Sequence, residues 1–334
     1  MRVYLIAIQL FIQLLLVKGY AQIPIHYSFD GKRQTIKLVN DYCVYDKDNH
    51  VAFTSLESWR GNLYLAFREG EGHVPTSKED NGKIIILKSD GESWVNDETF
   101  MLEGIDLRDP FLLNWNNKLF LYTLGFFSEL TETGWTPLKQ IKHNAPHYLN
   151  IWKIREHSGL LYGIGNAYNE WPILLTSYDG INWFVKEEFK LGGNASEADM
   201  CFIKNKVFIC VRIDTPVGSY SLFGRGEYPF DAFSWSVLDI SIASPELIAV
   251  SNKKMLLAGR EYDKHSKDGA DDEYMTVLYI NTKGEILSRL RSLEDSGGDK
   301  GYPSFCIFDK ELLMSYYSGE LNKTKIHLMK LNIK

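Results

Sequence analysis

The sequence predicts an all-β protein and, within that class, a six-bladed β-propeller. After residue 21 the apolar runs are short and end at Gly, Asn, Asp or Lys, as strands do, and no segment has the length and period of a helix. A strand, a polar turn and a second apolar strand also recur six times, at intervals of about 40 to 58 residues. Each interval fits one four-stranded blade.

The six repeats define the elements that we expect. Each is the inner hairpin of one blade, and its first strand lines the central channel. Residues 22–46 precede the first hairpin, and we expect them to add an outer strand that helps to close the ring. Residues 22–334 then form a single domain. A five-bladed ring, with one hairpin wrongly assigned, is the structural alternative. The hairpins begin at Ala52, Asp109, Asn150, Glu197, Ser244 and Tyr302.

A second repeated element lies between these hairpins. It reads "LKSDGESW" at 87–94 and "LLTSYDGINW" at 174–183, so both copies place Asp-Gly-x-x-Trp after an apolar strand. The Asp can accept hydrogen bonds from the backbone of the turn, the Gly permits a positive φ, and the Trp can pack back onto the blade. The element therefore indicates architecture rather than catalysis.

The first 21 residues are interpreted as a secretory signal peptide. Arg2 precedes an apolar run that extends to Val17, and Gly19 and Ala21 place small residues where a signal peptidase cuts. The run is short for a membrane span, so we expect no stable membrane insertion. The expected location is secreted or periplasmic.

Charge limits the partners that we expect. The chain has 37 Lys and Arg against 43 Asp and Glu, a formal net charge of −6, and no long basic run. Nucleic acid and anionic membrane surfaces are therefore poor partners. Aromatic residues make up 13% of the chain, which suits both β structure and the stacking of sugars. No metal-ligand spacing typical of zinc occurs, and we expect no cofactor.

The chain has four cysteines, two of them in one hairpin. If Asn205 and Lys206 form a two-residue turn, Cys201 faces Cys210 in a non-hydrogen-bonded pair, where side chains lie closest. The spacing thus allows a cross-strand Cys201–Cys210 disulfide in an oxidising compartment. Two buried thiols are the alternative.

The repeated turns resemble the Asp-box repeats of the sialidase superfamily, which typically read Ser-x-Asp-x-Gly-x-Thr-Trp. The box here is one residue shorter, and its first copy has Lys88 where the second has Ser177. The hairpin "SEADMCFIKNKVFICVRID" at 196–214 is similar to a sialidase hairpin that a Glu opens and an Arg closes. The resemblance covers nearly the whole chain in architecture and about half of the site.

The resemblance implies catalytic roles for Glu197 and Tyr302. In the family a Glu polarises a Tyr near the start of the last blade, the Tyr attacks the anomeric carbon, and a first-blade Asp is the acid/base. Arg212 and Arg260 match two arginines that bind the substrate carboxylate, with structural ion pairs to Glu197 and Glu261 as the alternative. The family's first-blade Arg-Ile-Pro motif has no counterpart in "HVAFTSL", and its first-blade Asp has no clean match.

Polar residues after the first strand pair add candidates. "FREGEGH" at 67–73 is the densest polar cluster in the chain. Arg68 follows its apolar strand as Arg212 and Arg260 follow theirs, and we therefore predict that all three bind the same substrate group. His73 is a candidate acid or base.

Later blade starts add three more candidates. "DLRDPF" places Arg108 and Asp109 at the second blade, where Asp109 is a candidate acid/base or an acceptor that holds Arg108. "SPELI" places Glu246 at the fifth. An acid beside Pro at a blade start also resembles five-bladed glycosidase families, in which separate carboxylates act as acid and base. Asp109, Glu197 and Glu246 would form that set.

Three functions follow from these candidates. The first is a sialidase-like exo-glycoside hydrolase that acts on an acidic terminal sugar of an oligo- or polysaccharide. The second is a polysaccharide lyase, because a uronate carboxylate also needs arginines and a Tyr or His base. The third is a non-catalytic glycan-binding propeller. The missing first-blade Arg favours this function or the lyase over the hydrolase.

Overall fold

The computed structural model describes residues 27–30, 35–75, 81–146, 148–167, 171–263, 272–292, 298–320 and 322–334. The predicted signal peptide lies outside them. Every regular element in this part of the chain is a strand. None of the described residues forms an apolar helix long enough to cross a membrane.

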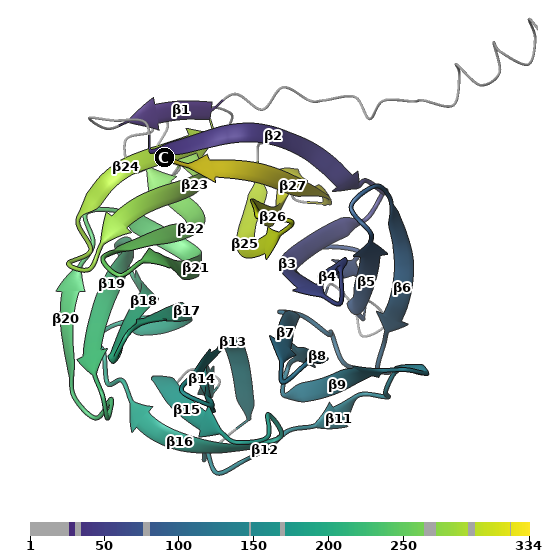
Figure 1. The fold of residues 1–334 in the computed structure, drawn as a ribbon, viewed down its shortest axis with the longest axis horizontal. Coiled ribbons are helices and arrows are strands. Elements are labelled where there is room, and N and C mark those ends of the chain that lie inside the picture. The colour runs from purple at the N-terminus through teal and green to yellow at the C-terminus, as the bar shows by residue number, and fades with distance from the viewer. Residues whose placement is uncertain are drawn as a thin grey trace, which may run out of the picture.

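Six small sheets stand around a central axis as the blades of a propeller (Figure 1). The six-bladed prediction is confirmed, and each predicted hairpin forms the two strands of its blade nearest the axis. The first blade contains β3 (His50–Trp59), β4 (Asn62–Gly70), β5 (Lys83–Ser89) and β6 (Trp94–Phe100). The second contains β7 (Phe111–Trp115), β8 (Lys118–Thr123), β9 (Phe126–Thr131), β10 (Gly134–Trp135) and β11 (Lys139–Gln140). The third contains β12 (Lys142–His143), β13 (Leu149–His157), β14 (Leu160–Ala167), β15 (Pro172–Ser177) and β16 (Asn182–Glu188).

Strands from the start of the sequence close the ring. β2 (Ile36–Tyr45) pairs antiparallel with β27 as the outermost strand of the sixth blade, which confirms the predicted outer strand. β1 (Tyr27–Asp30) pairs with β24 at the edge of the fifth blade. The fourth blade contains β17 (Asn194–Ile203), β18 (Lys206–Thr215), β19 (Gly218–Glu227) and β20 (Phe233–Val237). The fifth contains β21 (Ser241–Ser251), β22 (Lys254–Asp263), β23 (Asp272–Asn281) and β24 (Ile286–Ser292). The sixth contains β25 (Asp299–Phe308), β26 (Glu311–Glu320) and β27 (Lys323–Ile333).

Apolar side chains fill the six interfaces between neighbouring blades. Between the first and second blades, for example, Ile84 packs with Leu112 and Leu119, all at most 2% exposed. The inner strands have neighbouring blades on both faces. They therefore read as nearly continuous apolar runs, and burial of those runs is the main force that holds the ring together.

The two Asp-Gly-x-x-Trp turns have the predicted geometry. Asp179 Oδ1 accepts two backbone N–H groups of its turn at 2.8 Å, Gly180 has a φ of 74°, and Trp183 is fully buried and donates to the Gly180 carbonyl at 3.0 Å. In the first copy Asp90 accepts a backbone N–H at 3.1 Å and Gly91 has a φ of 105°. Each turn joins the two outer strands of its blade.

The predicted Cys201–Cys210 disulfide is wrong. The β17–β18 hairpin turns at residues 204–205, one position earlier than predicted, so Cys201 pairs with Phe208 and Cys210 pairs with Asp199. The two sulfur-bearing side chains are diagonal neighbours instead of direct partners. Both thiols are free and buried, and burial raises the pKa of each.

The inner strands share an irregularity where they reach the axis. β3, β13, β17, β21 and β25 each contain a register shift near their first residues. Phe53, Asp109, Ser244 and Tyr302 lie at this point in their blades with left-handed φ values of 61°, 51°, 45° and 46°. A bulge turns a side chain out of its normal direction and is common beside active sites. The fold therefore aims one group of residues at the axis.

Candidate active site

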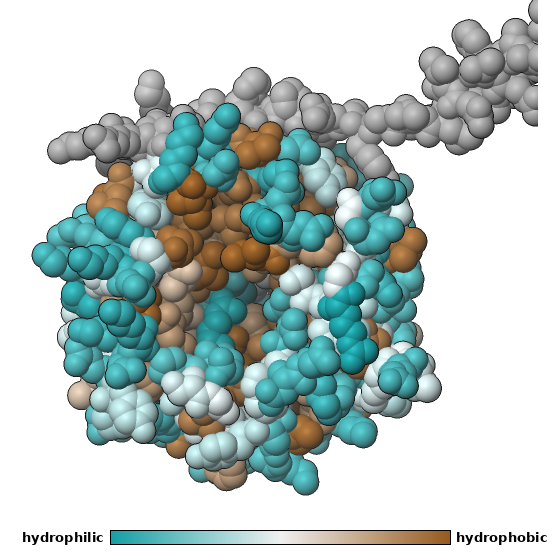
Figure 2. Space-filling model, in the orientation of Figure 1, coloured by the Kyte–Doolittle hydropathy of each residue, from teal (hydrophilic) through white to brown (hydrophobic). Residues whose placement is uncertain are grey.

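A small cavity lies where these irregular segments meet, and residues from all six blades line it. Its volume is about 20 Å³, which is room for one water molecule. Figure 2 shows the ring hollowed at its centre, with hydrophilic residues in the depth. Because every blade contributes, the site exists only when the ring is closed. The cavity is lined by Thr54, Asp109, Pro110, Trp152, Lys153, Glu197, Ala198, Ser244, Pro245 and Tyr302.

Tyr302 and Glu197 are in direct contact at this cavity. The Tyr302 hydroxyl donates a short hydrogen bond to Glu197 Oε1. Glu197 Oε2 accepts Arg212 Nη1 at 3.1 Å and the backbone N–H of Ser244 at 2.7 Å. Ser244 Oγ accepts the backbone N–H of Tyr302 at 2.9 Å. Three blades thus hold the phenol and the carboxylate in one orientation.

Burial and a neighbouring charge together keep the proton on the tyrosine. Burial raises the pKa of Tyr302 well above its ordinary value, and the Glu197 charge raises it further. Burial also acts to raise the pKa of Glu197, but Arg212, the Tyr302 hydrogen bond and Arg260 together lower it below its ordinary value. The pair is therefore a neutral phenol facing an ionised carboxylate, as a nucleophile faces its base.

Arg212 and Arg260 lie close together on neighbouring blades. Their guanidinium carbons are 5.7 and 5.9 Å from the centroid of the Tyr262 ring. Arg212 Nε also donates to Asp214 Oδ1 at 2.9 Å, and Arg260 Nη2 lies 3.7 Å from Asp299 Oδ1. Arg260 Nε is buried and has no hydrogen-bond partner among the described residues. The two planar cations are suited to a shared carboxylate ligand.

Asp109 is the third ionisable group of the cavity. Its Oδ2 accepts the side-chain amide of Asn150 at 3.3 Å, whereas its buried Oδ1 has no hydrogen-bond partner among the described residues. Burial raises the pKa of Asp109; nearby Arg108 opposes that change and the Glu197 charge adds to it. A raised pKa favours the protonated carboxyl group, which is the form that can donate a proton.

Phe53 supplies an aromatic ring from the first blade to this side of the site. Its ring centroid lies 4.5 Å from that of Tyr302, 5.2 Å from that of His73 and 4.8 Å from the guanidinium carbon of Arg108. Arg108 Nη2 donates to the His73 carbonyl at 2.9 Å, and its side chain is 27% exposed. The second blade therefore brings a guanidinium to this side of the site.

Arg68, which was predicted to bind substrate, does not line the central cavity. Arg68 is fully buried, and it donates to Asp106 Oδ1 at 2.7 Å and to the Gly72 carbonyl at 2.8 Å. Its guanidinium is tightly enclosed, since a Cβ at Gly82 would lie 2.0 Å from Asp106 Oδ1 and 2.3 Å from Arg68 Nε. Arg68 holds the loop that carries His73, and none of its side chain is exposed.

Glu246 also differs from its prediction. It is 1% exposed and accepts Lys153 Nζ at 2.6 Å and Arg155 Nη2 at 3.2 Å. Arg155 reaches Asp199 Oδ2 at 2.6 Å, and the same carboxylate oxygen accepts the backbone N–H of Leu247 at 2.6 Å. Glu246 thus belongs to an ion-pair layer that ties the third, fourth and fifth blades together, not to the substrate surface.

Several residues of the site were missed in the sequence, among them Phe53 and Ser244. A signal for them existed. When β3, β21 and β25 are aligned on their register shifts, Phe53, Ser244 and Tyr302 occupy one position. Asp109 has a similar left-handed φ, and Glu197 is the second residue of the register shift in β17. Identical backbone positions in different blades point at the same axis, whatever the residue type.

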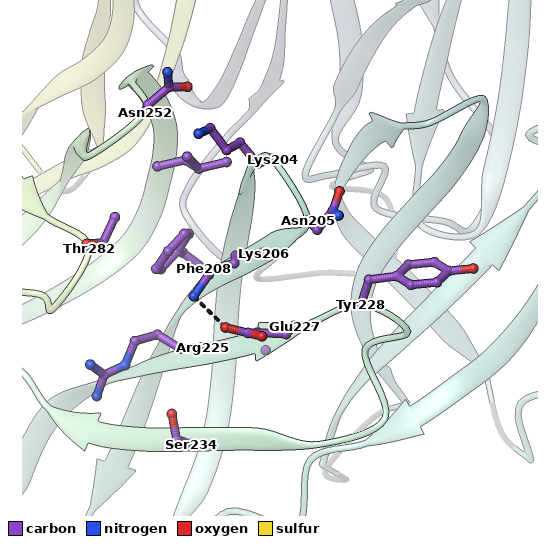
Figure 3. Close-up of a pocket in the computed structure, with 12 residues that line it drawn as sticks. Lys204, Asn205, Lys206, Phe208, Arg225, Glu227, Tyr228, Ser234, Asn252 and Thr282 are labelled. Atoms are coloured by element: carbon purple, nitrogen blue, oxygen red, sulfur yellow. Dashed lines mark ion pairs between the residues drawn. The ribbon is translucent and has the colours of Figure 1, made fainter.

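A larger cleft of about 810 Å³ opens at the other end of the β17–β18 hairpin (Figure 3). Lys206 and Glu227 form an ion pair in it, and Lys204, Arg225 and Tyr228 are among its walls. None of its described lining residues pairs a carboxylate with a phenol or an imidazole. The catalytic candidates are therefore gathered at the central cavity and not in the larger cleft.

No protein family matches the sequence, and no curated protein does. Solved structures do match. The K499G mutant of NanB sialidase from Streptococcus pneumoniae is 10% identical with a TM-score of 0.64, over 86% of this chain and 70% of that one. Trypanosoma rangeli sialidase in its covalent complex with 2,3-difluorosialic acid is 12% identical with a TM-score of 0.58, over 91% and 58%. YjhT is 8% identical with a TM-score of 0.52, over 86% and 99%. The chain therefore has a divergent sialidase-like propeller fold.

Proposed function

We propose that the protein is an exo-glycoside hydrolase that removes an acidic terminal sugar from a glycan. The observation that carries the proposal is the Tyr302–Glu197 contact, in which a neutral phenol donates to an ionised, buried carboxylate. Tyrosine nucleophiles are the known exception among glycosidases that otherwise use two carboxylates. The sialidase-like fold supports the same chemistry.

Each group has one task in the proposed reaction. The Tyr302 oxygen attacks the anomeric carbon while its proton passes to Glu197. Asp109 gives its proton to the departing glycosidic oxygen, so the bond to the leaving group breaks as the bond to Tyr302 forms. A water molecule then attacks the same carbon with Asp109 as base, and Glu197 returns its proton to the tyrosine.

The substrate carboxylate is assigned to Arg212 and Arg260, with Arg108 at the Phe53 side. Arg212 now shares its guanidinium with Glu197. When a substrate carboxylate occupies Arg212, the Glu197 charge is less well compensated and its pKa rises. Binding of an acidic sugar would therefore make Glu197 a stronger base at the moment it is needed. We also propose that the protein works outside the cytoplasm, as its apolar amino-terminal run predicts.

The test compares fluorogenic aryl glycosides of acidic and neutral sugars. We expect turnover of an acidic glycoside and none of neutral ones. Tyr302→Phe should reduce turnover to background, and Glu197→Gln should lower kcat by about 10²- to 10⁴-fold because the proton acceptor is lost. The matched control is Tyr178→Phe, since Tyr178 is 79% exposed on a distant turn and should behave as wild type.

Three results would each refute part of the proposal. Wild-type turnover in Tyr302→Phe would eliminate the nucleophile. With an acidic oligosaccharide that has no aryl group, an unsaturated sugar product that absorbs in the ultraviolet would show the lyase. Binding of acidic glycans with no turnover of any glycoside would show that the protein is a non-catalytic glycan-binding propeller.

A further inference from the structure

Three side chains of types that can ligate a metal meet between the first and sixth blades, beside the candidate active site. His50 begins β3, His73 lies in the loop after β4, and Asp299 begins β25. Their ligand atoms all lie within 4.8 Å of one another. His50 Nε2 is 2.8 Å and His73 Nδ1 is 2.6 Å from the same atom, Asp299 Oδ2. We propose that these three residues bind one divalent transition-metal ion of the zinc type.

The donor atoms select the class of ion. Two imidazole nitrogens and one carboxylate oxygen suit Zn²⁺ and similar ions, whereas Ca²⁺ and Mg²⁺ prefer oxygen ligands alone. Catalytic zinc sites commonly have three protein ligands of this kind and one open position. Ligand distances of about 2.0–2.2 Å require donors about 3.3 Å apart, so each nitrogen would withdraw from Asp299 by roughly half an ångström. The ion would replace the protons that now bridge these atoms.

The surroundings provide what a metal site needs besides its ligands. The Tyr317 hydroxyl donates to Asp299 Oδ1 at 2.7 Å, which fixes the carboxylate with Oδ2 toward the two imidazoles. Arg260 also lies on the Oδ1 side, at 3.7 Å, so the carboxylate separates this cation from an ion at Oδ2. The His73 side chain is 35% exposed, whereas those of His50 and Asp299 are at most 3% exposed. An ion can therefore enter past His73 and reach two buried ligands.

The site is placed to act on the same substrate. The His73 ring packs against Phe53, which contacts Tyr302, and Asp299 neighbours Arg260. An ion with an open position here would hold a water molecule or a substrate oxygen next to the arginines. That role depends on the proposed function, whereas metal binding itself does not.

The experiment measures metal binding directly. The full chain is stripped with a chelator, dialysed and titrated with Zn²⁺ by calorimetry, and Co²⁺ is added separately to record its visible absorption. We expect one ion per chain with a micromolar or tighter Kd, and a Co²⁺ spectrum of low coordination number. His73→Ala should weaken binding by at least about 100-fold, since it removes a ligand at the accessible edge without disturbing the core. His143→Ala, which removes a histidine outside the cluster, should bind as wild type.

Millimolar or absent binding by the wild-type chain would overturn the proposal, and so would unchanged affinity in His73→Ala. His50→Gln provides a second ligand variant, with circular dichroism to confirm that it is folded. Tyr302→Phe separates the two proposals, because it should abolish turnover and leave the Zn²⁺ titration unchanged. If the wild-type chain does not bind Zn²⁺, the test of Tyr302 as the nucleophile is therefore unaffected.

Discussion

Glu197 accepts hydrogen bonds from three blades and so holds the proposed nucleophile Tyr302, the guanidinium of Arg212 and a backbone N–H at once. Each donor stabilises its ionised form, which explains why its pKa is lowered in a buried place. Asp109, in the same cavity, has one partnerless oxygen and a raised pKa. This difference between the two carboxyl pKa values supports the proposed roles, with Glu197 as base and Asp109 as acid.

Replacing the acid tests this assignment at the residue scale. Asp109→Asn should lower kcat/KM by about 10²- to 10⁴-fold on glycosides with poor leaving groups, because no proton reaches the glycosidic oxygen. The loss should be much smaller on aryl glycosides with good leaving groups. In the wild type, activity should fall as the pH rises through the raised pKa of Asp109, since only the protonated form donates. An equal loss on both substrate classes, or a variant that keeps this alkaline decline, would contradict the role.

At the scale of the element, the Asp-Gly-x-x-Trp turn fixes how two outer strands meet. Asp179 satisfies the turn's backbone N–H groups, and Trp183 fills the interface between the second and third blades with its ring fully buried. All the parts lie within five residues. A local motif can therefore be recognised in sequence and assigned to structure, and neither copy approaches the central cavity.

Removal of the buried indole tests the architectural assignment. Trp183→Ala should lower the free energy of unfolding by about 3–5 kcal/mol, because it removes a large buried ring and leaves a cavity. Trp171→Ala is the matched control; Trp171 is 40% exposed, so the change should stay within about 0.5 kcal/mol. Urea unfolding measures both. A Trp183 variant as stable as the control would show that the turn does not anchor the blade.

For the whole molecule, the central axis is where closure of the ring concentrates charge. Lys153 and Arg155 from the third blade meet Asp199 and Glu246 from the next two. Burial raises the pKa of Glu57, from the first blade, to about 7, although its Oε1 accepts the Ser58 N–H at 2.8 Å. The blades are thus joined by apolar interfaces at their flanks and by ion pairs at the axis.

Glu57 makes stability depend on pH. Its folded pKa is raised, so the folded state binds the proton more tightly and Glu57 disfavours folding progressively as the pH rises from about 4.5 to 7. This difference between the folded and unfolded pKa of Glu57 lowers the free energy of unfolding by at most about 3 kcal/mol above pH 7. Glu57→Gln should therefore raise the unfolding free energy at pH 8 and have little effect at pH 4.5. Chemical unfolding at both values checks this, and an equal effect at both would exclude titration of Glu57 as the cause.

Much of the fold was readable because its signals repeat. The six hairpins and the outer strand from the first residues were predicted correctly, and the central cavity does contain Asp109, Glu197 and Tyr302. The disulfide error came from the position of one turn. The errors at the site concern side-chain direction. Arg68 and Arg260 both follow apolar strands, but Arg68 turns into its own blade and Arg260 reaches the site. Strand position alone cannot separate these outcomes, because each depends on which acceptors the adjacent loop and blade offer.

The sequence by itself determined the number of blades, the turns that shape them and the nucleophile–base candidates, because these follow from short-range patterns repeated along the chain. The tertiary structure alone decided which distant groups meet. His50 and Asp299 are 249 positions apart, and only the closed ring places them 2.8 Å from each other. The physical reason is that a bulge and a neighbouring blade set the direction of each side chain at the axis. Neither the bulge nor the neighbouring blade can be inferred from the residues that flank the side chain in the sequence.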